Sequence, residues 1–469
     1  MTRWVLRCRE LAAMVDAEQA FRALFGASRR AYWLDSSMVG GPARYSVLGE
    51  CAGPYADVLT ERVRSQSDSV DSVDSVYDRL EGRLAARRVD VPPGLPAELA
   101  CGYVGYFGYE LRAHDGAPSP HRSELPDAYW LAATRYLALD QVAGRAWVVE
   151  LGTADTPTSW LDAAAATLAD LPPNVPHSDC PTPEPEPEPD PWLARPRETY
   201  LRDVRHCLDR LRAGDSYEVC LTNTVEVPFA GGAIEAFEAY CRLRRRNPAP
   251  YAAYLRLDDL HVLSASPERF LRVDARGYAE SRPIKGTAPR GDDPAADDLV
   301  RKELSSSTKA QAENLMIVDL VRNDLGRVCE PGSISVPEFC SVESYATVHQ
   351  LVSTVRGRLR ADVTAVRAAR ACFPPGSMTG APKLSTMRIL DRLETRARGI
   401  YSGALGHFGL AGTADLSVVI RTAVIHRGRL TVGAGGAIVL DSDPADEWDE
   451  MLVKAAVPLR ALVVPPCDE

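Results

Sequence analysis

A lysine in a short extended segment is the residue of this chain with the clearest potential for nucleophilic chemistry. It is Lys285, within Pro283-Ile284-Lys285-Gly286-Thr287. The preceding Arg282-Pro283 pair favours an extended backbone, and Gly286 lets the chain or a ligand pass close by. A lysine becomes a good nucleophile only when burial or a nearby cation lowers its pKa. Because most lysines are solvated, this segment gains weight only from its surroundings.

A glutamate precedes this lysine by one predicted hairpin. It is Glu268, in Ser266-Pro267-Glu268-Arg269-Phe270. On neighbouring strands a glutamate and a lysine commonly form a cross-strand ion pair. As a catalytic pair they would instead serve as general acid and nucleophile.

The segment 312–324 predicts a buried helix, because apolar residues lie nearly all round it. Glu313 shares a helical face with Ile317 and Leu320. A buried carboxylate is costly unless it is paired or bound to a metal. Two interpretations stay open: a salt bridge to an arginine, or a ligand for a hard cation such as Mg²⁺.

A second acidic helix is predicted after Asp443, which can cap it, with Pro444 in its first turn. Glu447, Glu450 and Lys454 fall at i, i+3 and i+7, on one face. Such Glu–Lys pairs are usually solvated. Together with Glu313, however, they could complete a carboxylate cage around one Mg²⁺.

Two glycine-rich segments, 374–383 and 433–437, are predicted to be turns. Loops of this kind can present backbone N–H groups to a carboxylate. They can also be simple tight turns. Neither segment matches a P-loop or a dinucleotide-binding fingerprint.

The composition is that of an ordinary globular protein, with a formal net charge of −10 over 469 residues. This charge argues against a general nucleic-acid partner. No apolar run is long enough to span a bilayer, and residues 1–10 contain no signal-peptide core. Eleven cysteines without a Cys-x-x-Cys spacing fit reduced thiols in the cytoplasm. We therefore expect a cytoplasmic protein with no membrane partner.

The chain is expected to divide into an N-terminal α/β region (1–170), a Pro/Glu-rich linker (171–198) and a catalytic region (199–465). The linker is acidic and proline-rich, so it should be extended and exposed. Other segments predict individual elements: strands at Ala31–Asp35, Trp147–Leu151 and Tyr217–Leu221, and a helix from Thr199 to Gly214. Their alternation indicates a mixed α and β fold (α/β or α+β).

In combination, these motifs resemble those of the chorismate-utilising enzymes, the superfamily of anthranilate synthase component I. The shared motifs are Ser-Pro-Glu-Arg-Phe, Pro-Ile-Lys-Gly-Thr, Glu-Asn-Leu-Met-Ile-Val-Asp-Leu, Thr-Gly-Ala-Pro-Lys and Glu-x-x-Glu-x-x-x-Lys. The resemblance is strong over 199–462 and weaker before it. It implies a large α/β sandwich with the active site in a cleft between its sheets.

Two positions indicate a subfamily. Anthranilate synthases normally carry alanine where this chain has Lys285, whereas isochorismate and salicylate synthases carry a lysine base at the position of Glu218. The residues 33–37 also lack the Leu-Leu-Glu-Ser pattern of tryptophan-regulated anthranilate synthases. The resemblance therefore favours the subfamily that aminates chorismate. The alternatives are anthranilate synthase component I, which would release pyruvate, and a catalytically inactive chorismate-binding subunit.

The resemblance also implies roles. Lys285 would attack the chorismate ring at C2 while Glu268 protonates the departing C4 hydroxyl; ammonia would then add at C4 and expel the lysine, giving 4-amino-4-deoxychorismate. Mg²⁺ would be held by Glu313 and Glu450, with Glu447 nearby. His349 matches a family histidine near the ring, although a lone histidine is as often a satisfied core residue. The positions implied in substrate binding are Ser377, Gly380, Tyr401, Arg421, Gly435, Gly436 and Lys454.

The reaction needs a source of ammonia. A glutamine amidotransferase uses a nucleophilic cysteine in a strained turn together with a histidine. We expect none of the eleven cysteines to stand in the Gly-x-Cys-x-Gly context of such a nucleophile. A separate glutamine amidotransferase subunit is therefore the expected partner, with free ammonia as a substitute in vitro.

Overall fold

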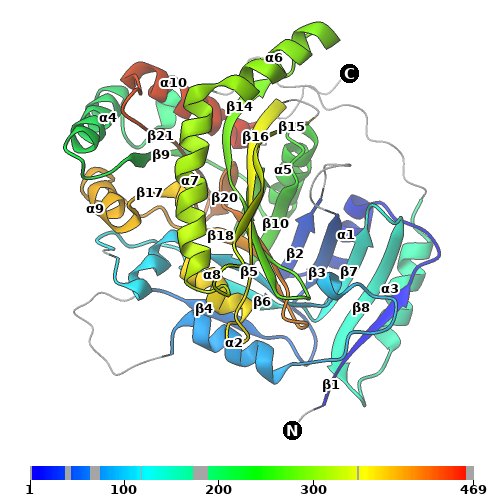
Figure 1. Ribbon diagram of the computed structural model, residues 1–469. Helices are drawn as coiled ribbons and strands as arrows, with labels where there is room; N and C mark the ends of the chain where they lie inside the picture. The colour runs from blue at the N-terminus through cyan, green and yellow to red at the C-terminus, as the bar shows by residue number, and fades with distance from the viewer. Residues whose placement is uncertain are drawn as a thin grey trace, which may run out of the picture.

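The computed structural model describes residues 3–36, 44–63, 74–117, 119–172, 188–345 and 348–460. These ranges form two large antiparallel sheets that share a hydrophobic cluster, with helices around them (Figure 1). The mixed α and β sandwich predicted from the sequence is thus confirmed. None of the helices within these ranges is long and apolar enough to cross a membrane.

The first sheet is formed by strands from both ends of the sequence. In spatial order its strands within the described ranges are β1 (Trp4–Glu10), β8 (Arg145–Thr153), β7 (Arg135–Asp140), β3 (Tyr45–Glu50), β2 (Arg30–Asp35), β10 (Tyr251–Leu257), β11 (Leu260–Ser266), β20 (Thr422–His426), β21 (Arg429–Ile438), β9 (Glu218–Pro228) and β17 (Gly380–Ala381).

The second sheet is built in the same way. In spatial order its described strands are β14 (Ile284–Pro289), β16 (Val348–Arg358), β13 (Tyr278–Arg282), β12 (Arg269–Val273), β19 (Ala414–Val418), β18 (Ala404–Gly409), β5 (Cys101–Phe107), β6 (Ala128–Ala132) and β4 (Val58–Glu61), with β15 (Ser335–Ser344) also paired to β16.

Helices pack against each sheet. Those on the first sheet are α1 (Ala17–Phe25), α3 (Ser159–Ala169), α4 (Arg197–Arg212), α5 (Ala233–Arg246) and α10 (Pro444–Leu459). Those associated with the second sheet are α2 (Val76–Ala86), α6 (Pro294–Ser306), α7 (Thr308–Gly326) and α8 (Ala365–Cys372). Helix α9 (Lys383–Leu393) packs against β9 and β17, and short 3₁₀ turns lie at η1 (Ala97–Leu99), η2 (Tyr109–Asp115), η3 (Asp190–Trp192) and η4 (Gly376–Met378).

The segments 1–170 and 199–465 are interleaved in both sheets. Each of the two large hydrophobic clusters also draws residues from both segments. The segments therefore do not bury separate cores. Most of the proposed linker, 173–187, lies outside the described residues, and its end is already structured, because Leu193 forms a β-bridge with Val225.

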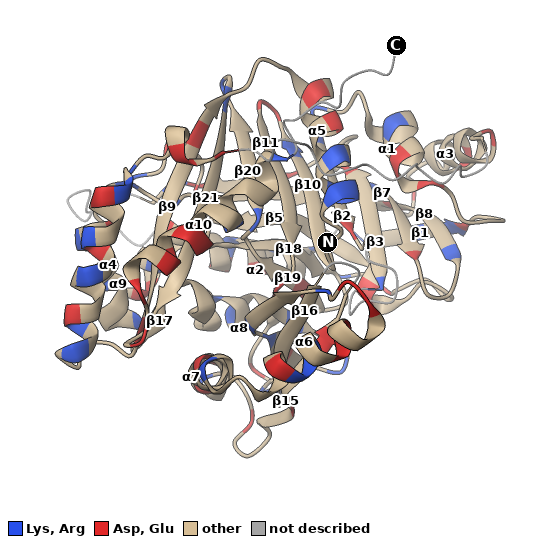
Figure 2. Cartoon of the chain, turned by 90° about the horizontal axis from the view of Figure 1, so that it is seen from above, with Lys and Arg blue, Asp and Glu red and all other residues tan. Residues whose placement is uncertain are grey.

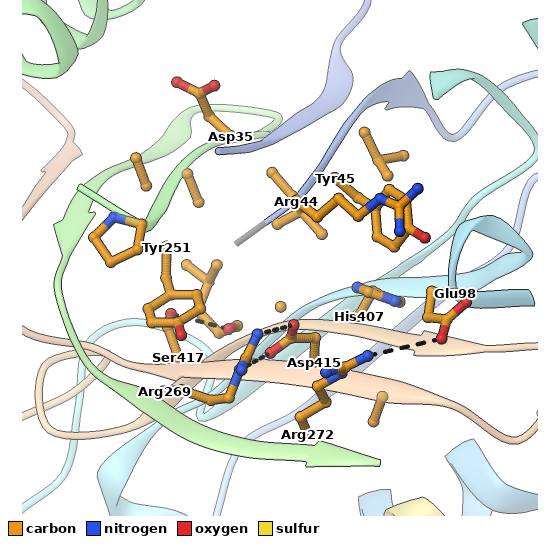
Figure 3. Close-up of a pocket in the computed structure, with 18 of the residues that line it drawn as sticks. Asp35, Arg44, Tyr45, Glu98, Tyr251, Arg269, Arg272, His407, Asp415 and Ser417 are labelled. Atoms are coloured by element: carbon orange, nitrogen blue, oxygen red, sulfur yellow. Dashed lines mark hydrogen bonds and ion pairs between the residues drawn. The ribbon is translucent and has the colours of Figure 1, made fainter. Parts of the chain in front are cut away.

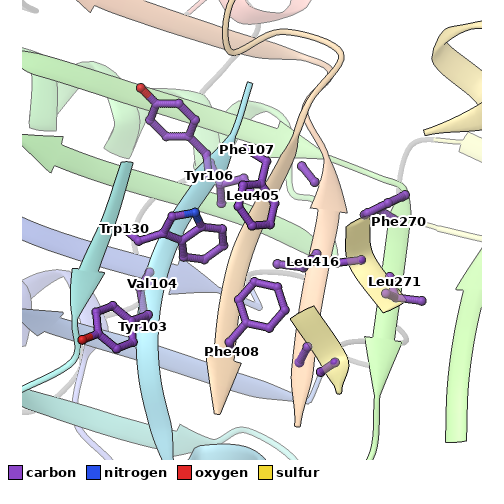
Figure 4. Packing of buried hydrophobic residues seen from close by; sticks show 14 of the residues in the cluster. Tyr103, Val104, Tyr106, Phe107, Trp130, Phe270, Leu271, Leu405, Phe408 and Leu416 are labelled. Atoms are coloured by element: carbon purple, nitrogen blue, oxygen red, sulfur yellow. The ribbon is translucent and has the colours of Figure 1, made fainter. Parts of the chain in front are cut away.

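Aromatic and aliphatic side chains fill the second sheet where its N-terminal and C-terminal strands meet. Phe107 of β5, Trp130 of β6 and Phe408 of β18 pack closely with tilted rings, their centroids 4.7–6.0 Å apart (Figure 4). All three side chains are fully buried. This packing fixes β18, and with it the chain that leads into it from Tyr401.

Most predicted elements are present. Strands β2 and β8 contain Ala31–Asp35 and Trp147–Leu151, and α4 ends at Arg212, two residues before Gly214, which adopts a positive φ of 79°. Figure 2 shows arginine interspersed with aspartate and glutamate along α4, while its apolar face is buried. The prediction that the 312–324 helix is buried all round is wrong. Helix α7 packs on β16 through one face, and Leu315 on the other is 54% exposed, as scattered surface leucines often are.

Candidate active site

Lys285 and Glu218 form a buried ion pair where β14 of one sheet approaches β9 of the other. The Nζ of Lys285 donates a hydrogen bond to Oε1 of Glu218 over 2.6 Å. The side chains are 11% and 0% exposed. The second oxygen of Glu218 is buried and has no hydrogen-bond partner among the described residues. It therefore remains available to a ligand or a proton.

This pair reverses one expectation from the sequence. Burial disfavours the charge on Lys285, but attraction to Glu218 and the hydrogen bond between them outweigh it and hold the pKa of Lys285 above its ordinary value. The lysine is thus protonated before any reaction, and its activation needs proton transfer rather than a low pKa. The pKa is raised because an anion, Glu218 on the other sheet, stabilises the charged lysine. The sequence had instead suggested that burial or a nearby cation would lower this pKa.

Glu268 lies close to this pair, in the turn between β11 and β12. Its side chain is buried, and burial raises its pKa to about 7, partly offset by the positive charge of Lys285. A carboxyl with this pKa is partly protonated at neutral pH. It can therefore donate a proton, as the sequence predicted for a general acid. Glu268 also lines a small cavity of about 20 Å³ together with Ser377 of η4.

The predicted metal-binding carboxylates come from α7 and α10. Asp443 caps α10 as expected, accepting hydrogen bonds from Ala445 and Asp446. Glu447 is buried; its Oε1 accepts a hydrogen bond from Ser442 over 2.6 Å, and its Oε2 has no partner in the described part of the chain. Burial and the nearby charge of Glu450 raise the pKa of Glu447.

Glu313 and Glu450 face the same region. Burial raises the pKa of Glu313, with further contributions from the negative charges of Glu218 and Glu450. The side chain of Glu450 is 54% exposed; partial desolvation disfavours its charge, but attraction to Lys454 outweighs this and lowers the pKa. Lys309 attracts Glu313, Glu447 and Glu450 alike. The three carboxylates therefore share one electrostatic environment.

These carboxylates do not form a closed metal cage. Within the described residues, the one His, Cys, Asp and Glu group with ligand atoms inside 4.8 Å of each other is Glu18, Glu238 and Cys241. There Arg22 and Arg245 already neutralise the acids. Glu313, Glu447 and Glu450 lie farther apart, as expected for like charges without a cation between them.

The second glycine-rich segment is not a turn, contrary to the prediction. Gly435 and Gly436 lie inside β21, paired with Thr222 and Leu221 of β9. A Cβ on Gly436 would lie 2.8 Å from Oε2 of Glu447, so this glycine makes room for the buried carboxylate. Lys454 donates to the carbonyl of Gly435 over 3.1 Å. Glycine is thus required here because the side chain of Glu447 approaches the backbone of β21 closely. A glycine-rich sequence is equally typical of a loop, so the sequence predicted a turn.

The first glycine-rich segment is only partly a turn. Gly380 lies in the two-residue strand β17, beside β9, and a Cβ there would lie 1.9 Å from the carbonyl oxygen of Glu218. Its φ of +127° also favours glycine. Gly380 therefore supports the strand that carries Glu218, whereas Ser377 of η4 borders the small cavity at Glu268.

Tyr401 packs against β21, and Arg421 directly precedes β20. The ring of Tyr401 occupies the space next to Gly433, where a Cβ would lie 2.2 Å from it. Burial lowers the pKa of Arg421, and this arginine has no ion pair among the described residues. It is therefore a half-buried cation available to an anionic ligand.

His349 is completely buried, and both of its ring nitrogens are engaged. Nε2 lies 2.9 Å from Asp297 of α6, and Nδ1 lies 2.8 Å from Ser344 of β15. This geometry favours the satisfied core histidine that the sequence left open. The catalytic role of His349 stays a prediction.

One cysteine does have the spacing of a glutaminase nucleophile. Cys51 stands in Gly49-Glu50-Cys51-Ala52-Gly53, which corrects the expectation that the sequence offers no candidate. However, the thiol of Cys51 donates a hydrogen bond to the carbonyl of Asp57, and burial raises the pKa of Cys51. A thiol nucleophile needs the opposite shift, so the local environment does not support this role.

A larger cavity of about 400 Å³ lies elsewhere between the sheets (Figure 3). Tyr251, Arg269 and Asp415 line it, and Asp35 at the end of β2 contributes to its wall. None of the site residues predicted from the sequence lines this cavity. It is therefore distinct from the acidic site at Lys285, and the sequence did not indicate it.

Comparison with known proteins agrees with this geometry. A family model described as chorismate binding enzyme matches residues 32–460, and the chain belongs to this family. It is 50% identical over 475 residues to "Aminodeoxychorismate synthase" of Streptomyces pristinaespiralis, covering 97% of the chain but 65% of that protein. It is 39% identical over 357 residues to "Aminodeoxychorismate synthase component 1" of Klebsiella aerogenes, covering 75% of each. The solved anthranilate synthase component I from Streptococcus pneumoniae TIGR4 superimposes with a TM-score of 0.72 at 27% identity, covering 89% of this chain and 92% of that one.

Proposed function

We propose that this chain aminates chorismate to 4-amino-4-deoxychorismate. The observation that carries the proposal is Lys285, buried and hydrogen-bonded to Glu218, with a protonatable Glu268 beside it. This arrangement offers a nucleophile, an acceptor for its proton and a general acid. The names of the relatives from S. pristinaespiralis and K. aerogenes support the same activity.

The chemistry begins with proton transfer. Lys285 passes a proton to Glu218, and its free amine attacks C2 of the ring. Glu268 donates a proton to the C4 hydroxyl, which leaves as water. Ammonia then attacks C4, and the bond between C2 and the lysine nitrogen breaks, returning the electron pair to that nitrogen. The lysine is regenerated, and the new amine loses a proton.

Binding of the dianionic substrate requires cations. Arg421 and Lys454 supply two of them, beside Tyr401 and the backbone at Gly435. Glu313, Glu447 and Glu450 suit Mg²⁺, because Mg²⁺ prefers oxygen ligands and Glu447 has a buried oxygen without a partner in the described structure. When bound there, the ion would spread the charge of a substrate carboxylate.

A partner must supply the ammonia. We propose a glutamine amidotransferase, because the naming of the K. aerogenes relative as a component implies a second one, and Cys51 lacks a nucleophile's environment.

All cysteines in the described ranges are free thiols, which supports a reducing compartment such as the cytoplasm.

The test is direct. The protein is incubated with chorismate, Mg²⁺ and an ammonium salt, and the product is identified by mass. We expect 4-amino-4-deoxychorismate without pyruvate. Pyruvate release would favour the alternative of anthranilate synthase component I, and unchanged chorismate would favour an inactive chorismate-binding subunit.

A further inference from the structure

Arg398, between α9 and β18, is buried with every N–H group directed at an acceptor. Nε and Nη2 donate to the two oxygens of Glu394 over 2.8 and 2.7 Å. Nη1 donates to the carbonyl of Met378 over 2.6 Å and to Oγ of Ser402 over 3.3 Å, and Nη2 also donates to the carbonyl of Cys220 over 2.8 Å. Since a guanidinium has five N–H donors, its hydrogen-bonding capacity is fully used.

Each acceptor outside the ion pair lies next to a residue of the candidate site. Met378 follows Ser377, and Ser402 follows Tyr401. Cys220 is two residues after Glu218 on β9. One side chain thus connects three segments of the chain, each of which carries a residue of the candidate site.

The other half of the pair is fixed just as closely. Oε1 of Glu394 accepts hydrogen bonds from the backbone N–H and the hydroxyl of Thr222, over 3.0 and 2.9 Å. The backbone N–H groups of Arg398 and Gly399 donate to Glu110 over 2.9 and 3.0 Å. The guanidinium therefore cannot shift without disturbing β9, η2 and the chain before Tyr401.

Burial of the pair suggests that its role is geometric. The side chains of Arg398 and Glu394 are 3% and 8% exposed. Removing two charges from water costs free energy that their attraction often only balances, so such a pair is a weak source of stability. Its many directional bonds instead restrict the segments to one arrangement.

We propose that Arg398 and Glu394 are positioning residues for the site at Lys285. They hold the segments bearing Glu218, Ser377 and Tyr401 in register and make no contact with substrate. The catalytic part of this inference rests on the proposed function. Because a displacement of about 1 Å can reduce a rate about 100-fold, small shifts of Glu218 relative to Lys285 are sufficient for a large effect.

The test uses Arg398→Lys, which keeps the positive charge, and Glu394→Gln, which keeps side-chain size; both lose the bidentate pair. The control is Arg396→Ala in the same loop, which removes an exposed ion pair with Glu226. We expect kcat to fall about 100-fold in both variants with KM changed less than about threefold, and the control to match wild type. Arg398→Ala should regain activity with guanidinium well below denaturing concentrations and not with urea.

Hydrogen exchange provides a readout that does not depend on activity. Exchange should accelerate at residues 218–222, 376–380 and 400–403 in the folded Lys and Gln variants, with the remaining chain unchanged. If wild type forms no product while exchange behaves as expected, the proposed function fails and the positioning role stands. Wild-type kcat and exchange in both variants would overturn the inference. So would global unfolding of both, because the pair would then serve stability.

Discussion

Lys285 and Glu218 are 67 residues apart in sequence, yet Nζ of one lies 2.6 Å from Oε1 of the other, and both side chains are largely buried. The contact forms because β14 and β9 belong to different sheets that approach at this point. It keeps the lysine charged and places a proton acceptor next to it. Activation of Lys285 is therefore coupled to Glu218.

Replacing Lys285, the proposed nucleophile, should abolish most activity. We expect Lys285→Ala to lower kcat by about 10³-fold or more, equivalent to about 4 kcal/mol, because no other amine in the described site contacts Glu218. Steady-state kinetics with ammonium measure this, with Lys302→Ala as the control, since Lys302 is an exposed lysine paired with Asp298. Near-normal turnover in Lys285→Ala across the pH range would rule out the covalent route.

The ion pair between Lys285 and Glu218 should also contribute measurably to the free energy of unfolding. Glu218→Gln leaves a buried cation without its partner, which should cost about 3 kcal/mol at neutral pH. The double variant Glu218→Gln with Lys285→Met should recover most of that loss, because neither charge remains. Denaturant unfolding of wild type, Glu218→Gln, Lys285→Met and the double variant measures the coupling. Asp298→Asn on the surface should change stability by less than about 1 kcal/mol, and equal losses in the single and double variants would contradict the assignment.

Glu268 should make stability depend on pH. Burial raises its pKa from 4.5 to about 7, so the unfolded chain ionises this carboxyl before the folded protein does. As pH rises from 4.5 to about 7, the folded protein therefore loses stability, by about 3 kcal/mol in total. Glu268→Gln removes this penalty. Its melting temperature should exceed that of wild type at about pH 8 and equal it at about pH 4.

The same carboxyl should appear in the kinetics. If Glu268 donates the proton to the leaving hydroxyl, the rate per neutral ammonia should fall as pH rises through about 7. Glu268→Gln should lose about 10²–10⁴-fold in kcat and this limb of the profile. If the rate of the variant falls with pH in the same way as that of wild type, the ionising group responsible is not Glu268.

The sequence singled out candidate reactive residues but did not predict their surroundings. Lys285, Glu268 and Glu447 stood out because their chemistry is local to a motif. The partnership with Glu218 and the Arg398 network depend on which strands meet, and no spacing along the chain encodes that. Gly436 was misread as part of a turn for the same reason: its missing side chain accommodates Glu447 from α10, a contact between distant elements.

The metal proposal predicts a specific loss. Glu313→Gln and Glu450→Gln should each raise the Mg²⁺ concentration needed for half-maximal activity by about tenfold or more, since each removes a charged oxygen ligand. Mg²⁺ should also raise the melting temperature of wild type with substrate and do so less in the variants. Asp449→Asn, an exposed acid on α10, is the control. Unchanged Mg²⁺ dependence in both variants would exclude these ligands.

The source of nitrogen gives the last prediction. Glutamine alone should support no amination by this chain, because Cys51 is buried and hydrogen-bonded to Asp57 and its thiol has a raised pKa. Ammonium should support it, because its neutral form, ammonia, is the attacking species; above about pH 7 the gain in neutral ammonia is offset by loss of the Glu268 proton. Adding a glutamine amidotransferase should restore the use of glutamine. Cys51→Ser is the matched variant: it should keep the ammonium-dependent rate. Glutamine-dependent product from the isolated chain that disappears in Cys51→Ser would show that Cys51 is a glutaminase nucleophile after all.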